Sequence, residues 1–461
     1  MSSVNVPWDP ELLKRYDLQG PRYTSYPTAP QFLESFDAQD FAQAIAKCNA
    51  SERDLSLYFH IPFCETLCYY CGCNKIVTHH KERAMPYLEA LEREMSAIAT
   101  QLDTTKPVAQ LHWGGGTPTY ISESEMRWLM AATRRHFNLL PGDALEASVE
   151  VHPGRMSVDK IYCLRDIGFN RLSMGVQDFD PDVQKAVNRY NSVEQVNAIM
   201  AAANECGFQS ISMDIIYGLP LQSVASLSKT LDEVIALSPD RISAFGYAHL
   251  PHLFKSQGLI DDDQLPAAQQ KLDMLQLIIE RLQAAGYVYV GMDHFAKTSD
   301  SLVKAQNEQA LYRNFQGYST HKGCELLAFG VSAISYFGDT YIKNSKDINE
   351  YQNLINANTP AFVSGVSLTR EDLIRKELIS QLICHFELNF ATFNQQFDID
   401  MAQHFAPELQ ALTPMVADGL VTLTPTGIQV NSAGRLLIRR ICMVFDQYLK
   451  SSSTALYSKV I

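Results

Sequence analysis

The chain has 461 residues, of which 46% are hydrophobic and 19% are charged, enough apolar material for a large core and more than one domain. The formal net charge of −13 argues against general nucleic-acid binding, and no apolar run approaches the ~20 residues of a membrane span. The N-terminus has Trp8, Asp9 and Glu11 in place of the basic stretch and apolar core of a signal peptide. We therefore expect a cytoplasmic protein with reduced thiols and with no membrane or nucleic-acid partner.

Short apolar strands alternate with helical segments from residue 55 onward. Ser192 and Gln195 form a capping box for one of these helices, and Gly207 is a plausible C-terminal stop. Six strand–helix units predict a parallel sheet with right-handed crossovers, as in α/β barrels. The expected strands are residues 55–61, 109–114, 147–151, 171–176, 211–217 and 242–247, with helical periodicity at 84–102 and 192–206.

A different pattern begins past residue 250. Residues 266–285 have the pattern of a helix and 287–294 that of a strand. A new unit begins near Ser367, where Thr369 can cap a helix that runs through Leu382, followed by a hairpin at 420–430 and a helix at 436–448. Residues 367–461 hold 8 Lys+Arg and 9 Asp+Glu, so a lid or packing domain is favoured over nucleic-acid binding.

Four of the ten cysteines lie within ten residues: Cys64, Cys68 and Cys71 form a C-x₃-C-x₂-C run, and Cys73 follows. Three thiolates this close can hold three irons of a [4Fe–4S] cube and leave the fourth iron open for chemistry. Three alternatives remain: a disulfide framework, a zinc site and a ferredoxin in which Cys73 is the fourth ligand. The other cysteines are scattered, no second ligand pair follows for zinc, and one residue between Cys71 and Cys73 hinders binding to two irons.

The cysteine spacing resembles that of the radical S-adenosylmethionine (SAM) enzymes. Further segments resemble one family among them, the oxygen-independent coproporphyrinogen III oxidases; they are residues 21–28, 69–75, 112–119, 170–177 and 313–318. The resemblance implies a [4Fe–4S] cluster whose open iron binds SAM, and a partial (β/α)₆ TIM-like barrel with a mainly helical C-terminal domain. We expect an N-terminal arm over the active site (1–30), a catalytic domain (31–366) and a winged-helix-like lid (367–461).

Polar residues lie just past the ends of the expected strands, where α/β barrels build their sites. Gly114–Gly116 is either a tight turn or a place where backbone approaches a ligand closely. Glu150 is either a solvated strand end or an inward carboxylate that pairs with the SAM ammonium or hydroxyl groups. His60 is more simply a core histidine than a ligand.

The resemblance also implies roles for single residues. Cys64, Cys68 and Cys71 bind the cluster, and Glu150 is expected in catalysis. The residues implied to contact the cofactors are Tyr58, Tyr70, Cys73, Gly115, Gly116, Thr117, Glu150, Gln177, Arg189, Asp214, Ala248 and Ile334. Among them, Tyr58, Ala248 and Ile334 line a first SAM, and Gln177, Arg189 and Asp214 bind a second.

The implied reaction is oxidative decarboxylation of two propionates of coproporphyrinogen III to vinyl groups, which gives protoporphyrinogen IX in haem biosynthesis. The implied partners are that substrate and a flavodoxin-like or ferredoxin-like electron donor, with the chain a monomer. A related haem chaperone is the alternative, although such chaperones usually lack the Gly72–Lys75 continuation and the N-terminal arm, and this chain has both. A radical enzyme with another substrate is the second alternative.

Overall fold

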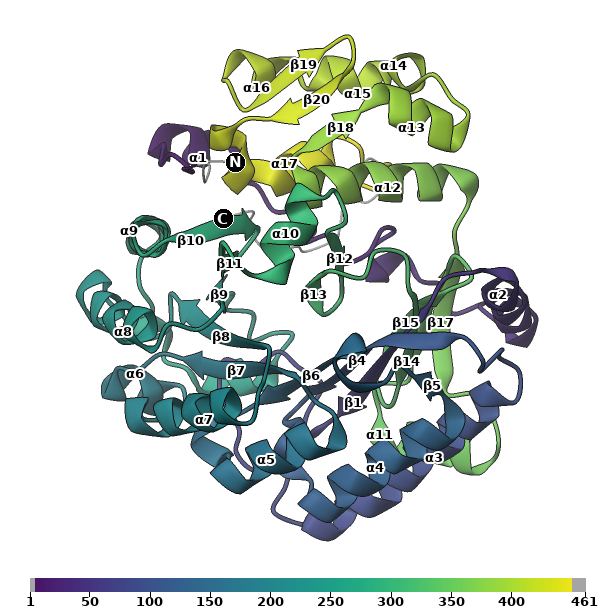
Figure 1. Ribbon diagram of the computed structural model, residues 1–461. Coiled ribbons are helices and arrows are strands. Elements are labelled where there is room, and N and C mark those ends of the chain that lie inside the picture. The colour runs from purple at the N-terminus through teal and green to yellow at the C-terminus, as the bar shows by residue number, and fades with distance from the viewer. Residues whose placement is uncertain (1–4, 450–461) are drawn as a thin grey trace. The chain divides into compact units, whose positions relative to one another are not determined.

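The computed structural model describes residues 5–449 (Figure 1). The chain divides into two compact units. Among the described residues, the first unit comprises 5–31, 275–322 and 368–449, and the second comprises 32–274 and 323–367. Residues 275–322 therefore pack with the C-terminal region, whereas we expected them within the catalytic domain. The long helix α9 (Ala268–Ala284) runs from the second unit into the first, at the position where a helix was expected.

A parallel sheet forms the core of the second unit, and each of the six expected strands is present. Neighbouring strands in the order β9-β8-β7-β6-β4-β1-β14 all pair in parallel. The strand β14 was not expected, because more than two hundred residues separate it from β1, its neighbour in the sheet. The strands are β1 (Leu55–Ile61), β4 (Pro107–Gly115), β6 (Glu146–Val151), β7 (Arg171–Gln177), β8 (Ser210–Tyr217), β9 (Arg241–Gly246) and β14 (Glu325–Phe329).

The sheet continues beyond β14 as an antiparallel meander of β15 (Ile334–Phe337), β16 (Thr340–Asn344) and β17 (Phe362–Ser367). Antiparallel neighbours need only short turns, so this extension follows directly in sequence. The fold class is therefore the expected one, an α/β radical-SAM-type partial barrel with a largely helical C-terminal region.

Amphipathic helices cover the parallel sheet (Figure 1). Ser192 and Gln195 form the expected capping box, and Gly207, with φ of +83°, follows the same helix. Ser122 forms a second capping box with Glu125. The apolar faces of the helices pack on strand residues that have no solvent exposure, such as Leu57. The helices of the second unit include α2 (Ala38–Ala50), α3 (Ala84–Ala99), α4 (Glu123–His136), α5 (Val158–Ile167), α6 (Pro181–Ala186), α7 (Val193–Glu205), α8 (Val224–Leu237) and α11 (Ile348–Asn356).

The first unit is built from helices and short hairpins. Thr369 caps α12 (Arg370–His385) as expected, in a capping box with Asp372. The expected hairpin is present in a three-stranded sheet of order β18-β20-β19 (Glu387–Asn389, Gly427–Val430 and Val421–Thr424). The expected helix at 436–448 is shorter: a 3₁₀ turn at Ser432–Leu437 precedes α17 (Ile438–Met443).

The expected strand at 287–294 is instead the start of a hairpin of β10 (Tyr287–Gly291) and β11 (His294–Lys297). Gly291 has φ of +147° and Met292 has φ of +53°, so the chain reverses there. A second hairpin follows α10 (Ser301–Asn307) and consists of β12 (Tyr312–Asn314) and β13 (Gly317–Ser319).

The N-terminal arm is built into the first unit and is not a solvated tail. It carries the short helix α1 (Pro10–Tyr16), and Tyr23 and Tyr26 are only 5% and 2% exposed. The Tyr23 hydroxyl donates a 3.0 Å hydrogen bond to Asp446, and the ring of Tyr26 lies 5.9 Å from that of Tyr448. The placement of this arm over the active site stays a prediction.

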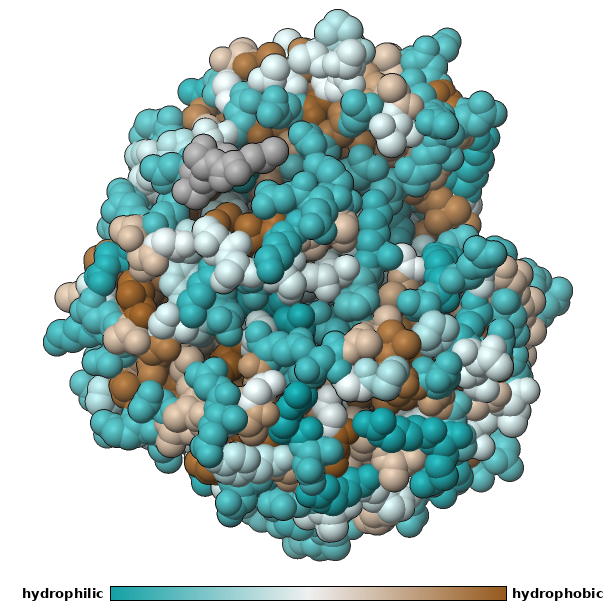
Figure 2. Space-filling view, viewed as in Figure 1, coloured by the Kyte–Doolittle hydropathy of each residue, from teal (hydrophilic) through white to brown (hydrophobic). Residues whose placement is uncertain are grey.

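No helix within residues 5–449 combines the length and apolarity that crossing a bilayer requires. On the face shown in Figure 2, hydrophilic residues predominate and hydrophobic ones are scattered in small groups. This distribution accords with the acidic composition.

A buried carboxylate ties α3 to the meander of the second unit. Glu94 accepts hydrogen bonds from Tyr351 Oη (2.6 Å), the Gly330 amide (2.8 Å) and Asn344 Nδ2 (2.6 Å). Burial raises the pKa of Glu94, and the three donors oppose that shift. The donors come from β16, α11 and the turn after β14, so one side chain connects four parts of the unit.

Replacing Glu94 by Ala should therefore leave these buried donors unsatisfied and lower the free energy of unfolding by on the order of 3 kcal/mol. Urea unfolding measures this, with Glu89→Ala, an exposed position on the same helix, as the matched control with a change near zero. A loss below about 1 kcal/mol for Glu94→Ala would contradict the assigned role.

Candidate active site

The cysteine segment leaves the sheet at the carboxyl end of β1. It starts with β2 (Phe63–Cys64) and returns through β3 (Ile76–Val77), which pair in parallel. The Ile76 amide donates to the Pro62 carbonyl (2.8 Å), and the Thr78 amide donates to the Cys64 carbonyl (2.9 Å). Residues 64–76 thus form a closed loop, which we name the cysteine loop, with all four nearby cysteines on it.

The thiols of the cysteine loop differ in burial and acidity. Cys64 and Cys68 are buried, Cys71 is half-buried and Cys73 is exposed; all ten cysteines of the chain are free. Burial raises the pKa of Cys64 to about 11. A hydrogen bond from the Cys73 thiol lowers the pKa of Cys71 to about 6, with Lys75 contributing. Cys73 is therefore a hydrogen-bond partner of Cys71 in this structure.

The segment after α6 holds the first half of the cysteine loop. The Tyr69 amide donates to the Val187 carbonyl at 3.0 Å. The Asn188 side chain, whose backbone has φ of +52°, donates to the Leu67 carbonyl at 2.8 Å. Two hydrogen bonds on either side of Cys68 fix the direction in which its thiol leaves the backbone.

The 3₁₀ segment Lys255–Leu259 holds the second half. The buried amide of Gln257 donates to the Tyr70 carbonyl (2.9 Å), and Ser256 Oγ donates to the Cys71 carbonyl (3.2 Å). Lys75 Nζ donates to the same Cys71 carbonyl at 2.8 Å. A Cβ on Gly72 would approach the Phe254 ring to 3.2 Å, so the loop lies against this segment.

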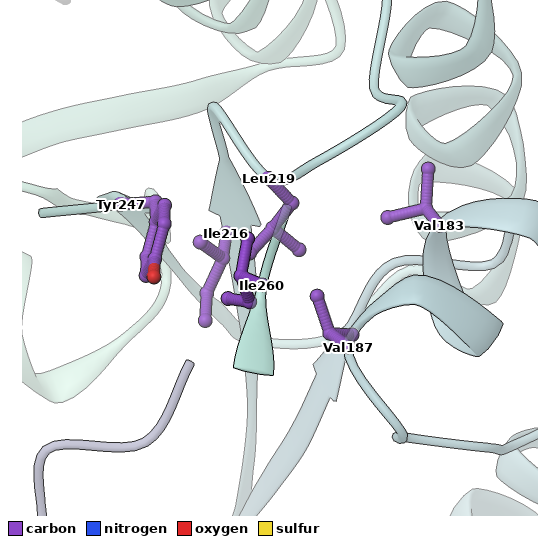
Figure 3. Packing of buried hydrophobic residues seen from close by; sticks show 6 residues of the cluster. All are labelled: Val183, Val187, Ile216, Leu219, Tyr247 and Ile260. Carbon is purple, nitrogen blue, oxygen red and sulfur yellow. The ribbon is translucent and has the colours of Figure 1, made fainter. Parts of the chain in front are cut away.

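An apolar cluster supports the aromatic residues of the loop. Figure 3 shows Ile216, Leu219 and Ile260 close together, with Val187 nearby. Tyr69 and Tyr70 pack against this cluster, which also includes Val183 and Tyr247. Burial of apolar surface therefore adds to the backbone hydrogen bonds in holding the loop.

A buried cation faces the loop. Arg189 is 8% exposed; its Nη1 lies 3.7 Å from Cys68 Sγ, and its Nη2 donates to the Gly175 carbonyl. Burial opposes the charge of Arg189, but Tyr70 and Cys68 outweigh it and raise its pKa. Gln177, with φ of +73°, ends β7 beside it; its Oε1 is buried without a hydrogen-bond partner. Both side chains leave Gly175 no room for a Cβ, which would lie 2.7–2.8 Å from them.

The glycine run lies against the start of the cysteine loop. The Gly116 amide donates to the Ile61 carbonyl (2.9 Å) and the Thr117 amide to the Phe63 carbonyl (2.9 Å). Thr117 Oγ1 lies 3.5 Å from Cys64 Sγ. A Cβ on Gly116 would lie 2.5 Å from the Pro62 oxygen and 2.9 Å from Cys64 Sγ. The close approach of two backbones therefore requires glycine, in addition to the turn at Gly115 with φ of +122°.

Glu150 at the end of β6 is oriented by a histidine. His112 Nε2 lies 3.1 Å from Glu150 Oε1, and the Gly115 amide donates to Oε2 at 3.3 Å. Burial disfavours the carboxylate, but the hydrogen bond and charge of His112 outweigh it and lower the pKa of Glu150. The lowered pKa keeps Glu150 as a charged carboxylate. The ring of its partner His112 stacks on the ring of Tyr58, with the two centroids 5.6 Å apart.

His60 is a satisfied core histidine. Its Nδ1 lies 3.1 Å from Tyr58 Oη, its Nε2 lies 2.9 Å from the Asn74 carbonyl, and burial lowers its pKa. It therefore connects β1 to the end of the cysteine loop and does not present a lone pair to a ligand.

The structure brings most of the expected site residues to the carboxyl edge of the sheet. Asp214 lies on β8 opposite Gly175 and accepts a 3.4 Å hydrogen bond from Ser173 Oγ. Ala248 is exposed just after β9, and Ile334 begins β15. Their expected contacts with SAM stay predictions.

The residues present fit an iron–sulfur cluster. Three cysteines lie on the anchored cysteine loop. The buried guanidinium of Arg189 faces the sulfur of Cys68, and Gly116, which has no side chain, leaves space beside the sulfur of Cys64. Within residues 5–449 no three His, Cys, Asp or Glu side chains converge enough to hold a single ion. Ligands of a [4Fe–4S] cube bind separate irons and need not converge on one point.

Sequence reasoning missed the residues that position this site. The sequence pattern assigns no role to His112, Asn188, Ser256 or Gln257. The only sequence signal for these residues was that Asn188 and Gln257 are polar and lie in segments that follow strands β7 and β9. Their partners are backbone carbonyls, which no side-chain spacing reveals.

Comparisons with known proteins agree with this geometry. The model of the radical SAM superfamily matches residues 58–234, and that of the HemN C-terminal domain matches residues 368–437. The oxygen-independent coproporphyrinogen III oxidase of Pseudomonas aeruginosa is 48% identical over 456 residues, which cover 99% of each chain. That of Escherichia coli is 49% identical over 453 residues, 98% of each chain.

The chain belongs to the family of oxygen-independent coproporphyrinogen III oxidases in the radical SAM superfamily. A solved structure, that of the coproporphyrinogen III oxidase of Escherichia coli, described as a radical SAM enzyme, superposes with a TM-score of 0.92 and 48% identity. It covers 96% of this chain and 100% of its own. The family match extends over both compact units.

Gly116→Ala should prevent assembly of the cluster, because the new methyl group would overlap the Pro62 carbonyl and the Cys64 sulfur. The variant is expected to lose most of its iron and acid-labile sulfide after anaerobic reconstitution, as measured by chemical analysis and visible absorbance. Gly258→Ala is the control, since a Cβ there meets nothing within 4 Å. A Gly116→Ala protein with full iron content would refute the close approach.

Asp214 should make stability depend on pH near neutrality. Its pKa is raised to about 7, foremost by burial and also by Glu150. A raised pKa means that the folded state binds a proton more tightly than the unfolded state, so stability falls as pH rises from about 4 to 7.

Asp214→Asn cannot lose that proton and keeps a partner for Ser173. Relative to the parent protein it should gain on the order of 2 kcal/mol in unfolding free energy between pH 5 and pH 8. Urea unfolding at the two pH values, without added cofactor, measures the difference. Parallel stability–pH curves for the two proteins would disprove the assignment.

Proposed function

We propose that this protein converts two propionate side chains of coproporphyrinogen III to vinyl groups, giving protoporphyrinogen IX. One observation carries the proposal: the likeness to oxygen-independent coproporphyrinogen III oxidases spans 99% of both chains and is not confined to the radical SAM segment. Each conversion removes one hydrogen atom from a propionate β-carbon, one electron and CO₂. A [4Fe–4S] cluster with SAM, when bound, supplies the radical that abstracts the hydrogen atom.

The chain's own task begins with the cluster ligands. Cys64, Cys68 and Cys71 would hold three irons, and the anchored backbone of the cysteine loop would orient their sulfurs. Arg189 places a positive charge 3.7 Å from Cys68 Sγ, where it offsets the negative charge of a thiolate ligand. Tyr70 and Cys73 are expected to contact the cofactors from the same loop.

Glu150 is suited to hold the cationic part of SAM. The hydrogen bond from His112 keeps its carboxylate charged, and the glycine run leaves room for a ligand at the same edge. Together with Gly115, Gly116 and Thr117, it would fix SAM against the cysteine loop. Tyr58, Ala248 and Ile334 would line this first SAM.

A second SAM would use Gln177, Arg189 and Asp214. The unpartnered Oε1 of Gln177 and the partly charged carboxylate of Asp214 are acceptors for a cationic, amine-bearing ligand. Both lie on strands β7 and β8, which pair next to each other.

The remaining proposals concern the setting of the reaction. Ten free cysteines and an oxygen-sensitive cluster suit a reducing cytoplasm. A flavodoxin-like or ferredoxin-like protein would supply the electron, and the chain would act as a monomer. Exclusion of water from the radical is the role expected of the N-terminal arm and of the C-terminal lid.

The test is product analysis of the reconstituted protein under nitrogen with dithionite, SAM and coproporphyrinogen III. The expected products are 5′-deoxyadenosine and protoporphyrinogen IX. Cys64→Ala, Cys68→Ala and Cys71→Ala should abolish both products and the cluster absorbance, whereas Cys163→Ala, on the outer helix α5, should retain them.

Two results would contradict the proposal. Tight haem binding with no vinyl product would favour the haem chaperone. Formation of 5′-deoxyadenosine without any change in the porphyrinogen would favour a radical enzyme with another substrate.

A further inference from the structure

Arg189 is a buried cation whose partners differ from those of an ordinary ion pair. Within residues 5–449 its hydrogen bonds go from Nη1 to Cys68 Sγ, at 3.7 Å, and from Nη2 to the Gly175 carbonyl. Its Nε is buried without a partner, and the residue is only 8% exposed. A guanidinium removed from water needs an anionic partner to offset the cost of burial. The fold offers it one sulfur and one carbonyl, and neither is a carboxylate.

The backbone around Arg189 fixes its position beside the sulfur. The Arg189 amide donates to the Gln184 carbonyl of α6 at 2.9 Å. Nη2 fills the space beside Gly175, where a Cβ would lie 2.8 Å from it. These residues and Cys68 all belong to the second unit, so the contact lies within one compact body. The fold of that unit therefore holds the guanidinium at the sulfur.

The charged groups around Arg189 and the cysteine loop do not duplicate its charge. Burial lowers the pKa of His152 to about 2, and the charge of Arg189 adds to that shift, so His152 is neutral. Burial raises the pKa of Asp214 to about 7, and Arg189 opposes that shift. Lys75 directs its Nζ to the Cys71 carbonyl at 2.8 Å and is half-buried, so water screens its charge. Of these two cations, Arg189 is the one shielded from solvent.

Reduction of a cluster on this loop adds negative charge next to Arg189. Three thiolates and a [4Fe–4S] core carry a net negative charge, and one electron from the donor makes that charge more negative. A positive charge nearby stabilises the reduced state more than the oxidised state, and burial strengthens the effect because little water screens it. This step rests on the proposed function, which assigns the cluster to the cysteine loop.

We propose that Arg189 raises the reduction potential of the cluster and thereby favours one-electron transfer from the donor protein. A purely structural role accounts for the hydrogen bond from Nη2 to Gly175, which a neutral amide would also make. It does not account for a permanent charge directed at Cys68 Sγ. Contact with a second SAM is compatible with this role, because the unpartnered Nε remains as a donor.

The experiment is a redox titration of the reconstituted holoenzyme under nitrogen, with mediators and without SAM. Visible absorbance and the electron paramagnetic resonance signal of the reduced cluster give the midpoint potential, and chemical analysis gives iron and sulfide. The variants are Arg189→Gln, which removes the charge, and Arg189→Lys, which retains it. The control is Arg127→Gln, which breaks a surface ion pair with Asp166 between the outer helices α4 and α5.

Arg189→Gln should lower the equilibrium constant for one-electron reduction about tenfold, which lowers the midpoint potential by about 59 mV. The shift should persist in high salt, because a buried charge is screened little. Arg189→Lys should keep most of the parent's potential, since it keeps the charge, and Arg127→Gln should match the parent protein.

Four results would overturn the proposal. One is an Arg189→Gln protein whose reduction constant stays within about twofold of the parent's. Another is a shift that disappears in high salt, which would place its origin at the surface. An equal shift in Arg189→Lys, or loss of iron from both variants, would show that the shape of the guanidinium matters and its charge does not. Loss of iron from Arg189→Gln alone, with the parent's potential in Arg189→Lys, would support the charge.

The titration also separates this proposal from the proposed reaction. If the parent holoenzyme forms no vinyl product but Arg189→Gln lowers the potential, the reaction fails and the role of Arg189 stands. If the parent forms protoporphyrinogen IX and all variants share one potential, the reaction stands and the role of Arg189 fails.

Discussion

The parallel register of β1 and β4 is the constraint on which the site depends. His60 pairs with Gly114 and Ile61 with Gly115, so both strands end at the same level of the sheet. The amide of Gly116 then bonds the Ile61 carbonyl, and the glycine run lies in contact with the first cysteine. A shift of one residue would exchange the two faces of the strand and separate these segments. One ladder of backbone hydrogen bonds, between β1 and β4, thus positions both the cysteine loop and the glycine run.

Charge is distributed around that edge by partners that are themselves buried. His112 holds Glu150 as a carboxylate, although burial alone would favour its neutral form. Asp214, one strand beyond β7, lacks a histidine and titrates near neutrality. Two carboxyl groups on one sheet therefore have different charge at the same pH, set by their immediate neighbours. A cationic ligand beside Glu150 would contact a charged carboxylate. A cationic ligand beside Asp214 would favour loss of the proton from that carboxyl group.

Much of this could be predicted from the sequence because the signals are local. Six strands, the capping boxes of Ser192 and Thr369, and the cysteine spacing each depend on residues within a short window. The strand β14 was missed because its partner β1 is remote in sequence. The last helix was placed too long because turns replace the helix after Met443. The residues that anchor the cysteine loop, such as Gln257, donate to backbone carbonyls. Because every residue has a backbone carbonyl, the sequence does not indicate which ones accept these hydrogen bonds.

A buried arginine beside the cysteine loop keeps its positive charge in an acidic chain. Arg189 donates to the backbone carbonyl of Gly175 and lies 3.7 Å from Cys68 Sγ. A carbonyl satisfies the hydrogen bonds of a guanidinium without cancelling its charge, whereas a carboxylate would do both. The positive charge of Arg189 therefore persists even though acidic residues outnumber basic ones in the chain. An anionic thiolate at Cys68 is the kind of partner that such a charge attracts.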